Sequence, residues 1–185
     1  MTFNRKSAKP RPFLNEGGLY EYAVRALGRQ MRSEAELRRL MSNHAEPGEQ
    51  GETAIEAALA RLRGHGYLND AAFAETYARL RQKNDKFGVR RVRQDLERKG
   101  IKSALIAETL EARYGQTSEE VLAREYLEHK RLRKPENDKE TARVMRRLLT
   151  AGFSTGVIYK ILRQWDVPDE TLAGLENLDE EPRGE

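Results

Sequence analysis

The sequence predicts an all-α protein, built as an elongated, curved array of three tandem three-helix repeats. Strong helix formers (alanine, leucine, glutamate, arginine and lysine) dominate residues 19–165, where glycine and proline are sparse. Apolar residues recur every three or four positions, and no stretch alternates with the period of two that is typical of a strand. The same succession of three helical segments is found three times, which indicates an internal repeat.

The first round of helices opens with an apolar residue every four positions from Leu19 to Met31, which predicts one amphipathic helix. Ser33, with a glutamate three residues later, predicts a capping box, in which side chain and backbone satisfy each other's hydrogen bonds at a helix start. A polar loop is expected at 43–51. Thr53, again with a glutamate three residues later, predicts a capping box for the third helix.

The second round starts at Asn69 or Asp70, either of which can cap its first helix. An apolar face that includes Leu96 predicts the next helix. Gly100 ends that helix, because glycine tolerates the left-handed conformation that a helix end often needs. Ser103 starts the last helix of the round.

The third round follows the same plan. Thr117 with Glu120 predicts another capping box. A second apolar segment ends at Gly152, and the last one reaches Trp165. Nine helices are therefore expected.

The spacing of matched residues supports true repetition. Isoleucines and leucines recur at intervals of 51 and 52 residues. The matched positions are Ile55, Ile106 and Ile158, followed by Leu59, Leu110 and Leu162. Repeats of this size cannot each bury a full core alone, so we expect them to stack into an array.

Charge is distributed unevenly along the chain. From residue 166 to the end, eight acidic residues and one arginine give a net charge of −7, so the rest of the chain carries +11 against a total of +4. We expect a flexible basic arm at 1–18, repeats at 19–68, 69–115 and 116–165, and a flexible acidic tail at 166–185. A basic body is typical of a protein with a polyanionic partner.

The sequence contains no recognisable catalytic or metal site. It has no cysteine, which excludes a disulfide framework, a thiolate zinc site and a thiol nucleophile. Its three histidines lack metal-ligand spacing, and no glycine-rich loop has a phosphate-binding form. No apolar run is long enough to cross a bilayer, and no secretory signal is recognisable. We therefore expect a cytoplasmic protein without cofactor, metal or membrane contact that is not an enzyme.

Basic residues are the candidate groups for binding a protein partner or a nucleic acid. Residues 79–102 hold ten lysines or arginines and three acids, a net charge of +7. Arginines of the predicted helix at 87–99 fall opposite its apolar face, and guanidinium groups can fork onto phosphate or carboxylate oxygens. A second, more diluted cluster follows later in the chain. The candidates are Arg81, Lys83, Lys86, Arg90, Arg91, Arg93, Arg98, Arg143, Arg146 and Arg147. The alternative for each is a solvated helix face.

Aromatic residues are expected in the core. Stacking on nucleobases needs exposed rings, whereas the aromatic residues in question fall on apolar faces. They are Tyr67, Phe73, Tyr77, Tyr126 and Trp165.

Two stretches resemble the signatures of the RecX family. Residues 66–74 read GYLNDAAFA, close to the family's glycine-tyrosine-leucine-aspartate-aspartate followed by phenylalanine and alanine. Residues 88–101 read GVRRVRQDLERKGI and resemble a second signature, which runs from a glycine to a Lys-Gly-Ile end. Asn69 departs from the usual aspartate at little cost, because both residues cap helices well. Scaffold roles are expected for the signature residues Gly66, Tyr67, Leu68, Asp70, Phe73, Gly88, Leu96 and Gly100.

The resemblance covers residues 19–165 and implies a regulator of the RecA recombinase in DNA repair and the SOS response. RecX-like proteins bind the RecA filament on single-stranded DNA and inhibit strand exchange and coprotease activity without catalysing a reaction. The implied partners are the RecA filament and single-stranded DNA, contacted directly or through the filament, and the protein is expected to be a monomer. One alternative is a direct DNA-binding regulator of the helix-turn-helix type, with the helix at 90–98 as recognition helix. A third hypothesis, an enzyme, lacks a supporting constellation.

Overall fold

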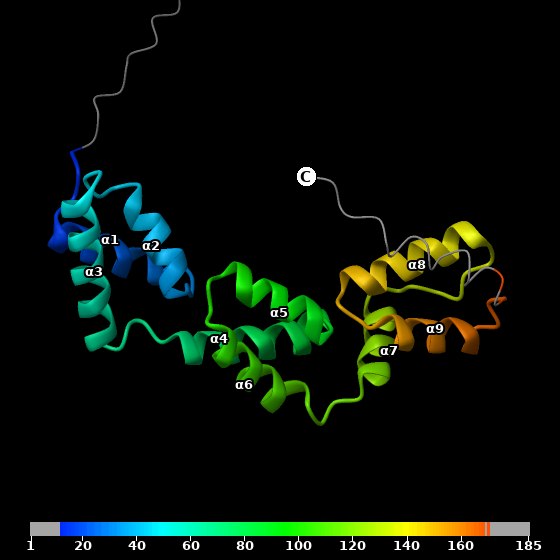
Figure 1. Ribbon diagram of the computed structural model, residues 1–185. Helices are drawn as coiled ribbons and strands as arrows, with labels where there is room; N and C mark the ends of the chain where they lie inside the picture. Colours follow the sequence, from blue (N-terminus) through cyan, green and yellow to red (C-terminus); the bar gives the residue numbers. More distant parts are fainter. Residues whose placement is uncertain (1–11, 169, 171–185) are drawn as a thin grey trace, which may run out of the picture. The chain divides into compact units, whose positions relative to one another are not determined.

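The computed structural model describes residues 12–168 and residue 170, and the regular structure of this part is entirely helical (Figure 1). Its elements are α1 (Glu16–Leu27), α2 (Glu34–Ser42), α3 (Glu49–Gly64), α4 (Asp70–Leu80), the π-helical turn η1 (Arg81–Asp85), α5 (Val89–Arg98), α6 (Ser103–Tyr114), α7 (Glu119–His129), α8 (Asp138–Thr150) and α9 (Thr155–Gln164). The chain divides into two compact units, Met1–Phe73 and Ala74–Glu185. The predicted all-α fold of tandem three-helix groups is confirmed, while the curved form and the repeat boundaries stay predictions.

The first unit has a core made by α1, α2 and α3. α1 packs on α3, and α2 packs on both. Ala45, after α2, and Leu68, after α3, join the buried side chains that come from all three helices. Those of the helices are Leu19, Ala23, Leu37, Met41, Ile55, Ala58, Leu59 and Leu62. Their spacing of three and four residues is the helical periodicity on which the prediction rests.

The capping box predicted at Ser33 is confirmed. Ser33 Oγ accepts a hydrogen bond from the Glu36 N–H (3.2 Å), and Glu36 Oε2 accepts one from the Ser33 N–H (3.1 Å). The start of α2 also has an acceptor from outside the helix, because Asp70 Oδ1 accepts from the Glu34 N–H at 2.9 Å. Asn69, not Asp70, caps α4, since its side chain accepts a backbone N–H of the first turn at 2.9 Å.

α1 begins earlier than predicted. Asn15 Oδ1 accepts from the Gly18 N–H at 3.0 Å, which starts the helix at Glu16. Residues 16–18 are therefore helical and do not belong to a flexible arm. Residues 1–11 of the predicted arm lie outside the described residues.

α1 also ends earlier than predicted, at Leu27. Ser33 has the extended backbone of an N-cap, so the chain before it leaves the helix. Met31 consequently does not continue the apolar face, and it is 49% exposed.

α3 starts four residues before the predicted cap at Thr53. The Thr53 hydroxyl donates to the Glu49 carbonyl at 2.8 Å, inside the helix, so no capping box forms there. Gly51 is buried in the first turn, where a Cβ would lie 1.7 Å from the Glu46 carbonyl oxygen. The glycine that indicated a loop therefore permits a close approach of helix and preceding chain, and the loop shortens to 43–48.

Tyr67 was expected in the core but is 53% exposed. Gly66 has a φ of 73°, and the Tyr67 N–H donates to the Leu62 carbonyl, which ends α3 and turns the chain. Leu68 then enters the core in place of the tyrosine and is 7% exposed.

In the second unit, α5 packs on α6. Buried apolar side chains of the second helical group are Ala74, Ala78, Val92, Leu96, Ile101, Ile106 and Leu110. Gly100 has a φ of 76°, and the Ile101 N–H donates to the Leu96 carbonyl, so the predicted end of α5 is confirmed. The aromatic residues Phe73 and Tyr126 are buried as predicted, while Tyr77 and Trp165 are only partly buried.

α7, α8 and α9 surround the third core, in which Phe153 is the largest side chain that is fully buried. α9 packs on both α7 and α8. The capping box predicted at Thr117 is wrong by one residue, because Ser118 caps α7 by accepting from the Val121 N–H at 3.4 Å. Glu120 instead pairs with Lys160, at 2.6 Å, and this contact lowers the pKa of the glutamate.

The second and third helical groups form one unit because the chain at 87–88 contacts both. The Gly88 N–H donates to the Ala151 carbonyl at 2.8 Å, and Phe87 packs against the third core. The Tyr114 hydroxyl donates to the Phe87 carbonyl at 3.1 Å, and burial raises the pKa of this phenol, which keeps it a donor. A Cβ on Gly88 would lie 2.4 Å from the Gly152 carbonyl oxygen, so glycine is required for this approach.

Candidate functional site

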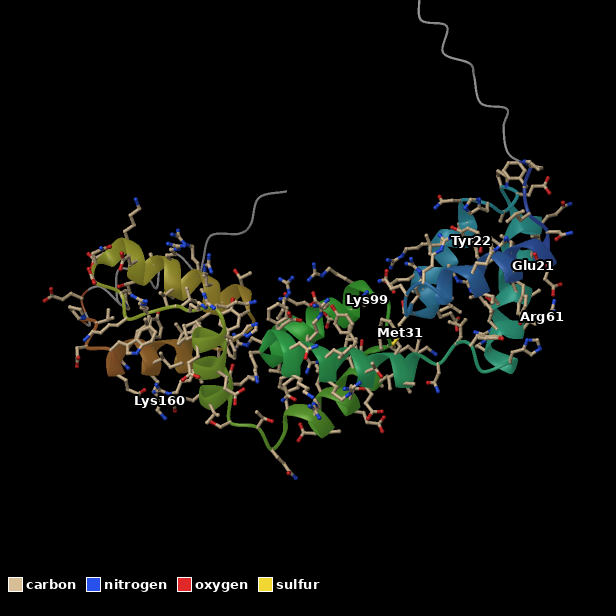
Figure 2. All side chains as sticks on the ribbon, turned by 180° about the vertical axis from the view of Figure 1, so that it is seen from behind. Glu21, Tyr22, Met31, Arg61, Lys99 and Lys160 are labelled. Carbon is tan, nitrogen blue, oxygen red and sulfur yellow. The ribbon has the colours of Figure 1, made fainter. Side chains whose placement is uncertain are left out.

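The candidate arginines lie mainly on α5 and α8, which are on the same side of the second unit, with α6 and α9 on the other (Figure 1). The C-terminal end of α8 meets the N-terminal end of α5, where Gly88 bonds to Ala151. Figure 2 shows nitrogen-tipped side chains projecting from the outer side of both helices. The fold therefore brings together two basic clusters that are more than 40 residues apart in sequence.

On α5 the structure separates the four candidate arginines into two pairs. Arg90 and Arg93 are exposed and have no ion pair among the described residues. Arg91 and Arg98 both contact Asp95, a carboxylate that is only 9% exposed. These two arginines neutralise a buried charge, so they are less available to a partner than their place in the helix indicated.

Asp95 also accepts a hydrogen bond from the Tyr77 hydroxyl, at 3.2 Å, which links α5 to α4. The Arg91 Nε lies 3.3 Å from the carboxylate but without hydrogen-bond geometry. The Arg81 guanidinium and the Lys99 ammonium lie over the Tyr77 ring, at 4.8 and 5.2 Å from its centre. Sequence reasoning did not identify Asp95, although arginines four residues before it and three after it were a visible signal.

The three candidates before α5 also differ from one another. Arg81 donates to Asp85 at 2.8 Å, and this hydrogen bond raises the pKa of the guanidinium. Lys86 donates to Glu125 of α7 at 2.7 Å. Lys83 is exposed and makes no ion pair within the described residues. Two of these three cations therefore serve internal contacts.

On α8 the three candidates share one outer face. Thr141, Met145 and their neighbours at helical spacing point into the core. Arg143, Arg146 and Arg147 are exposed, and none has an ion pair in the part of the chain that the structure describes. Exposed like charges without partners add little to stability, so this face is available for a polyanion.

Six of the ten candidates are exposed and have no ion pair among the described residues; apart from Lys83, they form a surface that we call the basic stripe. It consists of the exposed arginines on α5 and α8 without an ion pair among the described residues: Arg90, Arg93, Arg143, Arg146 and Arg147. The backbone contact between Gly88 and Ala151 fixes one helix end against the other. Pre-organised arginines of this kind can contact several phosphate or carboxylate groups at once.

The described residues contain no group of three or more histidine, aspartate or glutamate side chains that could hold a metal ion. Two histidines contact tyrosine rings: His65 Nδ1 lies 2.7 Å from the Tyr20 hydroxyl, and the His44 ring packs on Tyr22. None of the described helices is both long and apolar enough to span a bilayer.

Comparison with known proteins places these features in a family context. Residues 69–110 match the family model described as RecX, second three-helix domain. The chain is 34% identical over 145 residues to the regulatory protein RecX of Leptothrix cholodnii, covering 78% of this chain and 87% of the relative. It is 34% identical over 154 residues to the regulatory protein RecX of Thermus thermophilus, covering 83% and 94%. It spans 52% of the length of the Geobacillus kaustophilus relative, at 32% identity.

Crystal structures of RecX proteins are similar to this chain in fold. A crystal structure of regulatory protein RecX superimposes with a TM-score of 0.62 at 27% identity, over 80% of this chain and 71% of that one. The crystal structure of RecX from Lactobacillus salivarius gives a TM-score of 0.60 at 21% identity, over 82% and 96%, and supports the fold alone.

Proposed function

The chain belongs to the RecX family of regulatory proteins, and we propose that it binds RecA filaments on single-stranded DNA and mainly inhibits their recombinase and coprotease activities. This role would place the protein in DNA repair and the SOS response. The observation that carries the proposal is the basic stripe, five exposed arginines on two helices that meet end to end. A filament of protein on DNA is a polyanion that such a surface can bind.

Binding is proposed to rest on many weak contacts. Each exposed guanidinium contributes little alone, but contacts spread along a repetitive polymer add through effective concentration. Positive charge also speeds the encounter with a DNA-bearing filament and makes binding sensitive to salt. No chemical step is involved, so the protein acts as a regulator and not as an enzyme in this proposal. We further propose that it is cytoplasmic and monomeric.

The first test is strand exchange. We expect the purified protein to slow RecA-mediated strand exchange at substoichiometric amounts, because one bound copy blocks part of a continuous filament. The measurement is the rate of joint-molecule formation against protein concentration at low salt. If equimolar protein leaves the rate unchanged, the filament-modulator proposal is wrong.

Variants of the basic stripe localise the effect. Replacing Arg90, Arg93, Arg143 and Arg146 with glutamate is expected to weaken co-sedimentation with RecA filaments by about tenfold or more. The control carries the same charge change at exposed positions outside the stripe: Arg29, Arg79, Lys102 and Arg133 to glutamate. Circular dichroism should show equal helicity for both. Equally weak binding of the two variants would show that the loss of affinity comes from the change in net charge and not from the basic stripe.

The helix-turn-helix alternative has less support from the geometry. A recognition helix presents its N-terminal residues to base edges in the major groove. Only one side of the N-terminal turn of α5 is available for such contacts, because the other side packs against the turn after α8, where a Cβ on Gly152 would lie 2.2 Å from the backbone nitrogen of Arg91. Tight, sequence-dependent duplex binding by the isolated protein is the result that would favour this alternative.

A further inference from the structure

A pocket of about 300 Å³ opens beside the junction of the second and third helical groups. Its side chains come from η1 and the residue after it, from the C-terminal end of α6 and the turn that follows, and from α7. None of them belongs to the basic stripe. Its polar and charged side chains are Gln82, Lys83, Lys86, Arg113, Thr117 and Glu125. The pocket lies entirely within the second unit.

Positive charge dominates this pocket. Three cations line it against one acid, Glu125, which already accepts from Lys86 at 2.7 Å. Lys83 and Arg113 are exposed, and neither has an ion pair among the described residues. They come from different elements, the π-helical turn and α6, so two unneutralised cations face one hollow. An ammonium and a guanidinium in such a place favour an anion with several oxygens.

Two neutral side chains of the pocket, Gln82 and Thr117, are placed so that the Thr117 hydroxyl can donate a hydrogen bond to a ligand. Gln82 is 9% exposed, and its amide nitrogen donates to Thr117 Oγ1 at 3.3 Å and to the Arg113 carbonyl at 3.4 Å. Because the threonine oxygen accepts from the amide, its own proton is free to donate elsewhere. Ser118, not Thr117, caps α7, so helix capping does not account for Thr117.

We propose that this pocket binds a phosphate group of a nucleotide. Lys83 and Arg113 bind the phosphate oxygens, the Thr117 hydroxyl donates a hydrogen bond, and Gln82 is the positioning residue that orients Thr117. Val121, 53% exposed at the rim, offers an apolar contact to a sugar or base. The phosphate comes from a single-stranded nucleic acid backbone or from a free nucleotide. The site does not require a RecA filament, so it goes beyond the proposed function.

The test uses the full chain, labelled with ¹⁵N, and follows the amides of Thr117 and Val121 and the Gln82 side-chain amide by NMR. The probes are inorganic phosphate, adenosine monophosphate and a 20-nucleotide oligothymidylate. Shifts at these amides with all three probes support the shared phosphate chemistry. Shifts with the oligonucleotide alone identify the polymer backbone as the source, and shifts with the small anions alone identify a free nucleotide. If none of the probes moves these signals, the proposal is overturned.

Variants separate the pocket from general charge. The Lys83→Gln/Arg113→Gln protein is expected to bind the oligonucleotide about tenfold more weakly. Its binding should also depend less steeply on salt, by about 0.7 in the logarithmic slope for each phosphate that the variant no longer neutralises. The matched control Arg79→Gln/Lys102→Gln has the same charge but leaves the pocket intact. Equal weakening in both proteins would overturn the proposal.

The threonine gives an independent measurement. Thr117→Val should weaken binding with no change in charge, and Thr117→Ser should restore it because the hydroxyl returns. A valine variant that binds normally would remove the hydroxyl from the site and contradict the proposed geometry. Filament inhibition is measured separately on the same variants. Normal inhibition with loss of pocket binding, or the reverse, distinguishes failure of this site from failure of the proposed function.

Discussion

Single glycines determine how closely the second and third helical groups approach. Gly152 has a φ of 90°, which residues other than glycine rarely adopt. A Cβ at this position would lie 2.2 Å from the backbone nitrogen of Arg91. The backbone of α5 occupies the space that a side chain would need. The alignment of the basic stripe therefore depends on a position that has no side chain.

We predict that Gly152→Ala lowers the free energy of unfolding by about 2–3 kcal/mol, because backbone strain and steric overlap add. Gly156→Ala is the control, since this position is helical, exposed and has nothing within 4 Å of the new Cβ. It should be neutral or stabilise by up to about 1 kcal/mol. Urea denaturation of both variants measures the difference, and a similar effect in the two would contradict the close approach.

Capping determines where the helices start, and here two similar sequence signals have different outcomes. Ser33 and Thr53 each precede a glutamate by three residues, yet only the serine caps a helix. The difference arises because α3 extends back to Glu49, where acidic residues in its first turn suit the positive end of the helix dipole. Gly51 lets this extension pass the preceding chain.

We therefore expect Ser33→Ala to destabilise the protein by about 1–2 kcal/mol, through loss of the buried cap. Thr53→Ala should change stability by less than about 0.5 kcal/mol, because it only exchanges an exposed helical residue for a stronger helix former. The midpoint of urea unfolding distinguishes them. Comparable destabilisation by the two substitutions would mean that the helix starts at Thr53 after all.

Helix faces and most helix ends follow from sequence periodicity because they depend on neighbours three or four residues away. Contacts between elements that are far apart in the sequence do not follow from this periodicity. Nothing local determines that Leu68, and not Tyr67, enters the core, or that Thr117 receives a hydrogen bond from Gln82. The candidate arginines show the same limit: their spacing from Asp95 is visible in the sequence, but the burial of Asp95 depends on its contact with another helix.

The distribution of charge and the division of the chain into two units both affect the proposed function. The acidic residues of 166–185 lie largely outside the described residues, and Asp166, at their start, pairs with Lys134 at 2.9 Å. The basic stripe and the proposed phosphate pocket both belong to the second unit, whereas the first unit has a separate core of its own. Substitutions that impair binding or packing in the second unit should therefore leave the core of the first unit folded.

Hydrogen exchange on the full chain tests this division. Each unit has its own core, and the contacts through Phe87 and Gly88 join α5 to α8 inside the second unit. Gly152→Ala is expected to speed exchange of backbone amides in both α5 and α8, because the new side chain pushes the two helix ends apart. Amides of α3 should keep their native protection, and Gly156→Ala should change neither. Mass spectrometry of peptides from the three helices gives the readout. Faster exchange in α3 to the same extent as in α8 would show that the chain opens as one cooperative body, and the division into units would not describe its energetics.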